Sequence, residues 1–86
     1  MSWRVFVASS ATKFVQRLPR KDATRIKFVL EKELSRDPYA GDIKKLAGED
    51  NVWRRRVGSY RIFFEVYPVF QEVRVFDIER RGSNTY

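Results

Sequence analysis

A chain of 86 residues is long enough for one compact domain and too short for two independent hydrophobic cores, so we expect residues 1–86 to form a single domain. It contains neither Cys nor His, which excludes disulfide scaffolds, thiolate nucleophiles, zinc sites of the usual Cys/His kind and histidine-based catalytic triads. With 18 Lys and Arg against 11 Asp and Glu, the formal net charge is +7, so the expected partner is a polyanion, nucleic acid first.

The apolar runs of the sequence are shorter than a membrane span needs. The N-terminus leads directly into a strand-like segment instead of the apolar block of a signal peptide. We therefore expect a cytoplasmic protein without membrane association, and we expect no metal and no small-molecule cofactor.

The first half of the sequence predicts one strand and two helices. Residues 3–8 combine β-branched and aromatic side chains, which favours a strand, and Ser9 and Ser10 behind it are good helix N-caps. Apolar residues then recur at helical spacing over 11–18, up to a proline, and again over 22–36. The side chains expected to pack in the core include Trp3, Phe14, Leu18, Ala23, Ile26, Phe28, Leu30, Leu34 and Trp53.

The second half predicts three strands. Residues 37–42 contain Pro and Gly and are typical of a turn, whereas 43–51 fits no regular pattern. Segments rich in Val, Ile, Phe and Tyr follow at 52–57, 60–67 and 72–80. The expected fold class is α+β: a strand, a two-helix hairpin and a three-stranded antiparallel meander, with the helices packed on one face of an antiparallel sheet.

The register of the central hairpin follows from its turn. Gly58 and Ser59 match the Gly-first signature of a two-residue type II′ turn. The facing pairs are then Val57 and Tyr60, Arg56 and Arg61, Arg54 and Phe63, and Val52 and Glu65. Because side chains alternate along a strand, the core face receives Trp53, Arg55, Val57, Tyr60, Ile62, Phe64 and Val66. Arg55 is the irregular member of that face: either its charged end reaches solvent or the register is shifted by one residue.

The opposite face of the hairpin is crowded with cations. Arg54, Arg56 and Arg61 lie there together, and directly opposed like charges destabilise a sheet. One interpretation is a solvated basic face, balanced by nearby acidic residues. The other is that a polyanion supplies the counter-charge, with guanidinium groups on phosphate oxygens and Phe63 or Tyr67 stacked on a splayed base of single-stranded RNA.

Lys44 and Lys45 precede this hairpin. Two lysines are a weak signal, and both interpretations stay open for them, contact with an RNA backbone or an ordinary surface pair.

Residues 52–64 resemble the RelE/ParE superfamily of type II toxin–antitoxin toxins, whose members commonly carry an Arg-x-Gly-x-Tyr-Arg hairpin. In this sequence the motif runs from Arg56 to Arg61. The likeness extends to 44–48 and to 77–86, and the predicted order of elements agrees with it, so the resemblance covers nearly the whole chain.

The resemblance is to the RelE-like mRNA interferase branch. It implies a toxin that cuts mRNA in the ribosomal A site and inhibits translation. The cleavage would be metal-independent, with the vicinal 2′-hydroxyl as nucleophile. The residues it singles out as catalytic are Arg54, Arg56, Arg61, Arg80, Arg81 and Tyr86, and those assigned to RNA binding are Lys44, Lys45, Phe63 and Tyr67. By position, Arg61 matches the arginine that contacts the scissile phosphate, and Tyr86 matches the terminal tyrosine that orients the reacting nucleotide.

The general base stays unassigned. Members of the family often have Lys where this chain has Arg54, and Arg stays protonated at any relevant pH. The remaining candidates for the base are Tyr86, Glu65, Glu79 and Lys45.

Two rival functions remain at this point. The same fold carries toxins that inhibit DNA gyrase, which usually lack the dense hairpin arginines and the C-terminal Arg and Tyr, and a non-catalytic RNA-binding module is the other alternative. The partners that the resemblance implies are the ribosome with its rRNA, mRNA, and a cognate antitoxin whose acidic or amphipathic segment covers the basic face or the helical hairpin.

Overall fold

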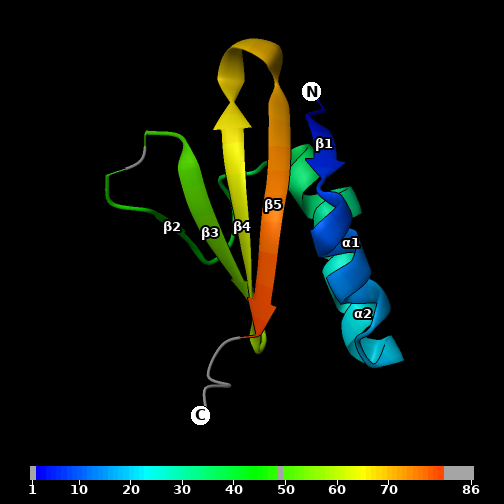
Figure 1. Ribbon diagram of the computed structural model, residues 1–86. Coiled ribbons are helices and arrows are strands. Elements are labelled where there is room, and N and C mark those ends of the chain that lie inside the picture. The colour runs from blue at the N-terminus through cyan, green and yellow to red at the C-terminus, as the bar shows by residue number, and fades with distance from the viewer. Residues whose placement is uncertain (1, 49, 81–86) are drawn as a thin grey trace.

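The computed structural model describes residues 2–48 and 50–80. Within these ranges, five strands form one mixed sheet in the order β1-β5-β4-β3-β2 (Figure 1). The strands are β1 (Arg4–Val7), β2 (Ile43–Lys45), β3 (Val52–Val57), β4 (Tyr60–Tyr67) and β5 (Glu72–Arg80). The α+β class and the antiparallel β3-β4-β5 meander are confirmed.

Two strands extend the meander at its edges: β2, which was not predicted, and β1, which was predicted as a strand. The segment without a regular pattern contains β2, which pairs antiparallel with β3 at one edge of the sheet. At the other edge β1 pairs parallel with β5, so the prediction of a purely antiparallel sheet was wrong. The direction of β1 is set by the path of the chain through the helices that follow it, which the residues of the strand do not encode.

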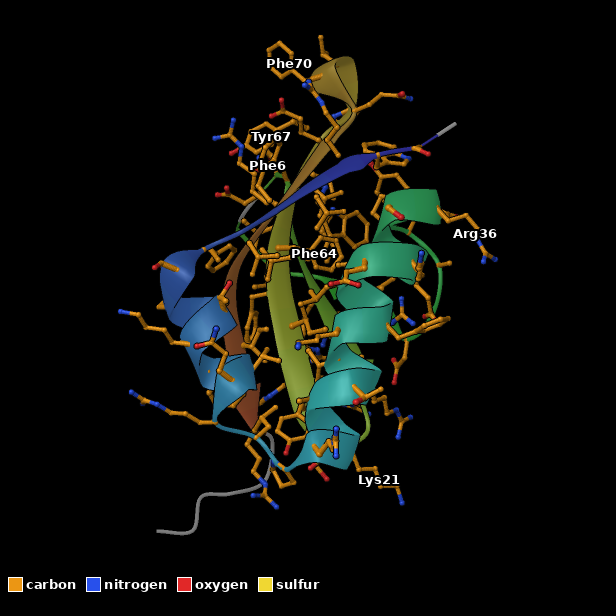
Figure 2. The ribbon with its side chains drawn as sticks, turned by 90° about the vertical axis from the view of Figure 1, so that its right-hand side faces the viewer. Phe6, Lys21, Arg36, Phe64, Tyr67 and Phe70 are labelled. Carbon is orange, nitrogen blue, oxygen red and sulfur yellow. The ribbon has the colours of Figure 1, made fainter. Side chains whose placement is uncertain are left out.

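The helices cover one face of the sheet (Figures 1 and 2). Helix α1 spans Ser9–Gln16, and α2 begins at Arg20 and runs to Phe28. The chain stays helical through a π-helical segment, η1 (Val29–Glu33), and a last turn, α3 (Leu34–Arg36). The helix expected over 22–36 is therefore continuous. The N-cap of α1 is Ala8 without a side-chain hydrogen bond, so the expected serine caps are instead the first residues of the helix.

The core lies between the helices and the sheet. Phe64 of β4 is fully buried and points toward the helices (Figure 2), and Ile26 and Leu34 contact the same layer from the helical side. Phe28, expected in the core, is 52% exposed. At about 100° per residue, Phe28 is about 200° around the helix from Ile26 and therefore points to solvent.

The predicted hairpin register is confirmed over every pair from Val57 and Tyr60 to Val52 and Glu65. Gly58 has φ +56°, as the first central residue of a II′ turn requires, and the φ of Ser59 is negative. Arg55 does face the core: it is only 9% exposed, pairs with Glu33 and donates from Nη1 to the carbonyl oxygen of Ala40 at 3.4 Å. The irregularity is thus a buried ion pair, and the register is not shifted.

No helix within the described ranges is both long enough and apolar enough to span a membrane.

Candidate nucleic-acid interface

The face of the sheet away from the helices, called the open face below, gathers cations from three neighbouring strands. Arg56 lies opposite Arg61 across β3 and β4, and Arg54 lies opposite Lys44 across β3 and β2. Residues directly opposite in an antiparallel pair project to the same face, so these four side chains form one basic patch (Lys44, Arg54, Arg56 and Arg61). The structure therefore brings together four of the residues that the sequence singled out.

The arginines of the basic patch have donors without acceptors. The Nε atoms of Arg54, Arg56 and Arg61 are covered by surrounding atoms, and none has a hydrogen-bond partner among the described residues. Native proteins pair nearly all such buried polar groups, so each exception calls for an explanation. Because these Nε atoms are covered, a ligand on this face would meet the terminal Nη groups of the arginines, which donate in the same fork.

The acidic neighbours balance the patch only partly. Asp42 Oδ2 lies 3.9 Å from Arg56 Nε, and Glu79 Oε1 lies 3.6 Å from Arg61 Nη2, both longer than a hydrogen bond. About half of each carboxylate side chain is exposed, at 61% for Asp42 and 49% for Glu79. Ion pairs in such a solvated position contribute little, so the positive charge remains available to a partner.

Aromatic rings border the basic patch. Phe63 lies opposite Arg54 in the hairpin, and its ring centroid is 6.3 Å from that of Phe76 at an interplanar angle of 37°. Phe76 was not identified from the sequence, nor was Phe6 on β1, although both are exposed aromatic residues on strands, at 42% and 47%. The available signal was alternation along the strand: Phe6 stands between two half-buried valines, and Phe76 follows a buried one.

Tyr67 lies away from the basic patch. It is six residues along β4 from Arg61, a distance of about 20 Å at the usual rise per residue. Its hydroxyl donates to Glu65 Oε1 at 2.9 Å, and Arg74 Cζ lies 5.1 Å from the ring centroid. Tyr67 and Phe63, both predicted to stack on bases, thus occupy separate parts of the open face.

Two other predicted residues project to the helix-covered side. Lys45 lies opposite Trp53 and Arg80 opposite Tyr60, both partners being members of the core-facing row. The Arg80 Cζ is 6.0 Å from the Tyr60 ring centroid, at a polar hollow of about 140 Å³ beside the hairpin turn. Arg81 and Tyr86 lie outside the described residues.

The buried phenol of Tyr60 is not suited to act as a base. Its hydroxyl donates to Asp22 Oδ2 at 2.8 Å. This hydrogen bond, burial and the negative charge of Asp22 all raise the pKa of Tyr60, while the nearby Arg80 charge opposes them. Tyr60 therefore stays protonated and ties the hairpin turn to the first turn of α2.

The remaining candidates for a general base have distinct positions. Glu79 lies beside Arg61, Glu65 is held by Tyr67 farther along β4, and Lys45 is on the other side of the sheet. Among the described residues, no three side chains of the types that commonly bind metals come together as a potential metal site.

Solved structures of toxins share this fold. The RelBE2 toxin–antitoxin complex from Mycobacterium tuberculosis contains a chain that is 21% identical, with a TM-score of 0.82 over 94% of this chain and 100% of that one. A chain of the RelB–RelE complex from Methanococcus jannaschii is 28% identical, with a TM-score of 0.72 over 94% and 98%. The YoeB/ParE toxin from Agrobacterium tumefaciens is 21% identical, with a TM-score of 0.73 over 91% and 98%.

No family profile matches the sequence, and neither does any curated protein. The likeness is therefore structural. It confirms the resemblance inferred from the hairpin, because this chain has the fold of the RelE-like toxin superfamily.

Proposed function

We propose that this chain, a member of the RelE-like toxin superfamily by fold, is the toxin of a type II toxin–antitoxin system and an endoribonuclease that cuts mRNA in the ribosomal A site. The observation that carries the proposal is the basic patch, in which four cations from three neighbouring strands share one face and the adjacent carboxylates stand beyond hydrogen-bonding distance. A phosphodiester backbone has the charge and the oxygens that these cations lack.

The chemistry follows from what arginines supply. The vicinal 2′-hydroxyl attacks phosphorus, a P–O bond forms to it, and the bond to the departing 5′-oxygen breaks. Arg61, flanked by Arg54 and Arg56, stabilises the negative charge that develops on the phosphate, a role for which fixed cations on a sheet need little reorganisation. The proposed cleavage is metal-independent, because guanidinium groups supply the positive charge that the reacting phosphate needs.

The 2′-hydroxyl proton must pass to a base, and the departing 5′-oxygen must receive a proton from an acid. Both groups must be other than these guanidiniums, since an arginine stays protonated. Within the described residues, the carboxylates nearest the basic patch are Asp42 and Glu79. By the resemblance, Arg80 or Arg81 would be the C-terminal arginine of the site, and Tyr86 would orient the reacting nucleotide. Arg80 projects to the helix-covered side of the sheet, so its part in this proposal depends on the resemblance alone.

The partners in this proposal are the translating ribosome, through its rRNA and mRNA, and a cognate antitoxin. Several of the similar solved structures are toxin–antitoxin complexes. An acidic antitoxin segment would neutralise the same charges that hold RNA, and the site of action would be the cytoplasm, where ribosomes translate.

The test compares wild type, Arg61→Ala and Arg36→Ala on ribosomes translating a defined message, with cleavage sites mapped by primer extension. Arg36 is a matched control because it is an exposed arginine at the end of α3, where its side chain projects outward from the side of the molecule (Figure 2). We expect ribosome-dependent cleavage by wild type and Arg36→Ala, and a loss of about a hundredfold or more in Arg61→Ala.

A second candidate function is inhibition of DNA gyrase, favoured by the match to a toxin described as YoeB/ParE. An intact message together with trapped gyrase–DNA complexes would move this function to first place. RNA affinity without cleavage would instead indicate a non-catalytic RNA-binding module.

A further inference from the structure

A groove of about 410 Å³ crosses the open face between β1 and β5, beside the basic patch. Its floor and walls come from Phe6 on β1, from Val75 and Phe76 on β5, and from the Glu65 and Arg74 pair. Large apolar side chains that stay half exposed on a small protein commonly mark a place where something binds.

A β-bulge forms the aromatic wall of this groove. Phe63 pairs with Asp77 and Phe64 with Val75, so Phe76 is an extra residue of β5 with no direct partner in β4. Alternation with the buried Val75 puts Phe76 on the open face, where its ring meets Phe63. Phe6 lies on the other side of the groove, placed on the same face by its pairing with Arg74.

The polar groups of the groove are held in place by neighbours. Glu65 lies opposite Arg74 across β4 and β5, so an acceptor and a donor stand side by side. Glu65 Oε1 accepts from the Tyr67 hydroxyl at 2.9 Å, and Arg74 Nη2 donates to Glu72 Oε1 at 3.1 Å. Both side chains keep further hydrogen-bonding capacity, because a carboxylate has about four lone-pair sites and a guanidinium five N–H donors.

The groove is continuous with the basic patch. Phe63 lies opposite Arg54, and the Cβ atoms of such a pair are about 5 Å apart. The ring of Phe63 also contacts the ring of Phe76. A strand of RNA whose phosphates lie on the arginines therefore has an aromatic surface within reach of the next base.

We propose that this groove binds one unstacked nucleobase of single-stranded RNA, with its face on Phe76 and Phe6 and its polar edge toward Glu65 and Arg74. The inference rests on the proposed function, since it names the part of the RNA that this face recognises beyond the phosphates. A base offers both donors and acceptors at its edge. An apolar side chain of a protein partner would instead cover Glu65 and Arg74 without pairing them, which is unfavourable.

The binding experiment uses the full chain and two probes of equal length. One probe is a fluorescent 2′-O-methyl hexa-adenylate, which has no free 2′-hydroxyl and so cannot be cut. The other is an abasic hexamer that keeps the phosphates and lacks the bases. Affinities are measured by anisotropy for wild type, Phe76→Ala, Phe76→Tyr and Phe28→Ala. Phe28 is a matched control because it is an exposed phenylalanine on α2, remote from the open face.

We expect Phe76→Ala to weaken binding of hexa-adenylate about tenfold and to leave the abasic hexamer unchanged, because it removes a stacking surface and no charge. Phe76→Tyr keeps the ring and should bind like wild type, as should Phe28→Ala. Thermal melts of all variants, with Phe6→Ala as a second groove variant, verify that each protein is folded.

Equal affinities of Phe76→Ala and Phe28→Ala for hexa-adenylate would overturn the inference, and so would equal losses of Phe76→Ala on both probes. Unchanged RNA binding with weaker antitoxin binding would also overturn it and assign the groove to a protein partner. Ribosomal cleavage by wild type separates the two proposals. Cleavage without an effect of Phe76→Ala on RNA binding would support the proposed function and overturn the base-binding groove. Base-dependent binding without cleavage would support the groove and overturn the proposed function.

Discussion

Neighbouring arginines of β3 have opposite environments. Arg55 faces the helices, is 9% exposed and pairs with Glu33, whereas Arg54 and Arg56 face away from the helices with Nε donors that have no hydrogen-bond partner among the described residues. On the covered side the protein supplies the counter-charge itself. On the open side two exposed carboxylates, Asp42 and Glu79, supply it only in part.

The covered side also shows what a structural arginine requires. Gly41, with φ +88°, lies so close that an added Cβ would be 2.6 Å from Arg55 Cζ, so the 37–42 loop is shaped around this guanidinium. On the open side the nearest carboxylates, Asp42 and Glu79, stand beyond hydrogen-bonding distance of Arg56 and Arg61. The role of each arginine in β3 therefore depends on whether the fold places a carboxylate within hydrogen-bonding distance of it, and not on how many arginines the strand contains.

The largest expected effect comes from replacing the arginines on each face of β3 separately. In the double variant Arg54→Gln and Arg56→Gln, we expect message cleavage to fall on the order of a thousandfold, because two cations that stabilise the reacting phosphate are lost. The free energy of unfolding should change by no more than about 0.5 kcal/mol, since repulsion between Arg56 and Arg61 is relieved. Cleavage on programmed ribosomes and urea unfolding measure the two effects.

Arg55→Gln is the matched control, one position along the same strand. It should lose stability while the folded fraction keeps its cleavage rate. A comparable loss of cleavage in both proteins would mean that the two faces of β3 are not functionally distinct.

The next effect concerns the covered side alone. Glu33→Ala leaves the Arg55 guanidinium buried without its partner, and we expect the free energy of unfolding to fall by about 2 to 3 kcal/mol. The estimate is below that of a fully buried pair because the Glu33 side chain is 37% exposed. Glu31→Ala, at an exposed position of the same segment, should be nearly neutral.

Thermal and urea unfolding measure this loss. A double variant, Glu33→Leu with Arg55→Leu, should recover part of the stability, since an apolar pair needs no counter-charge. If Glu33→Ala is as stable as Glu31→Ala, the ion pair does not hold Arg55 in place.

Much of this arrangement could be predicted because it depends on local rules. The Gly58-Ser59 turn and the alternation of side chains were enough to place Arg54, Arg56 and Arg61 on one face and Arg55 on the other. What could not be predicted depends on partners distant in sequence. Glu33 is 22 residues from Arg55, and nothing in the helical pattern marks it as the carboxylate that meets a strand.

Neither the groove nor the faces of the sheet on which Lys45 and Arg80 lie could be predicted, for related reasons. The bulge at Phe76 is visible only when β4 and β5 are paired, so the contact of this ring with Phe63 could not be predicted. The unpatterned 43–51 segment gave no register, so Lys44 and Lys45 were treated alike although they project to opposite faces. The interpretation of Arg80 came from the resemblance, whereas its pairing with Tyr60 places it by the helix side.

A smaller effect is expected on the covered side at the β3–β4 turn, where Tyr60 lies. Tyr60→Phe removes the hydrogen bond to Asp22, and we expect a loss of about 1 kcal/mol at neutral pH. The pKa of Tyr60 is raised in the folded state, so the native protein holds this proton more tightly than the unfolded chain does. The contribution is therefore complete below about pH 10, the ordinary pKa of tyrosine, and is lost as the pH rises through the folded pKa.

Urea unfolding at neutral pH and above pH 10 tests both statements. The difference between wild type and Tyr60→Phe should shrink at the higher pH. Tyr39→Phe is the control, because the Tyr39 hydroxyl has no hydrogen bond within the described residues and its loss should matter little at either pH. A constant difference across this range would show that the Asp22 hydrogen bond does not control the titration of Tyr60.

The smallest effect separates two adjacent lysines of equal charge. Each phosphate contact with single-stranded nucleic acid contributes about −0.7 to the slope of log K against log salt concentration. Lys44 lies on the open face opposite Arg54, so Lys44→Gln should make the slope for a single-stranded RNA shallower by about 0.7. Lys45 lies opposite Trp53 on the other face, so Lys45→Gln should leave the slope unchanged. The two variants have the same net charge, and equal changes in both would show that overall charge, rather than the open face, governs RNA binding.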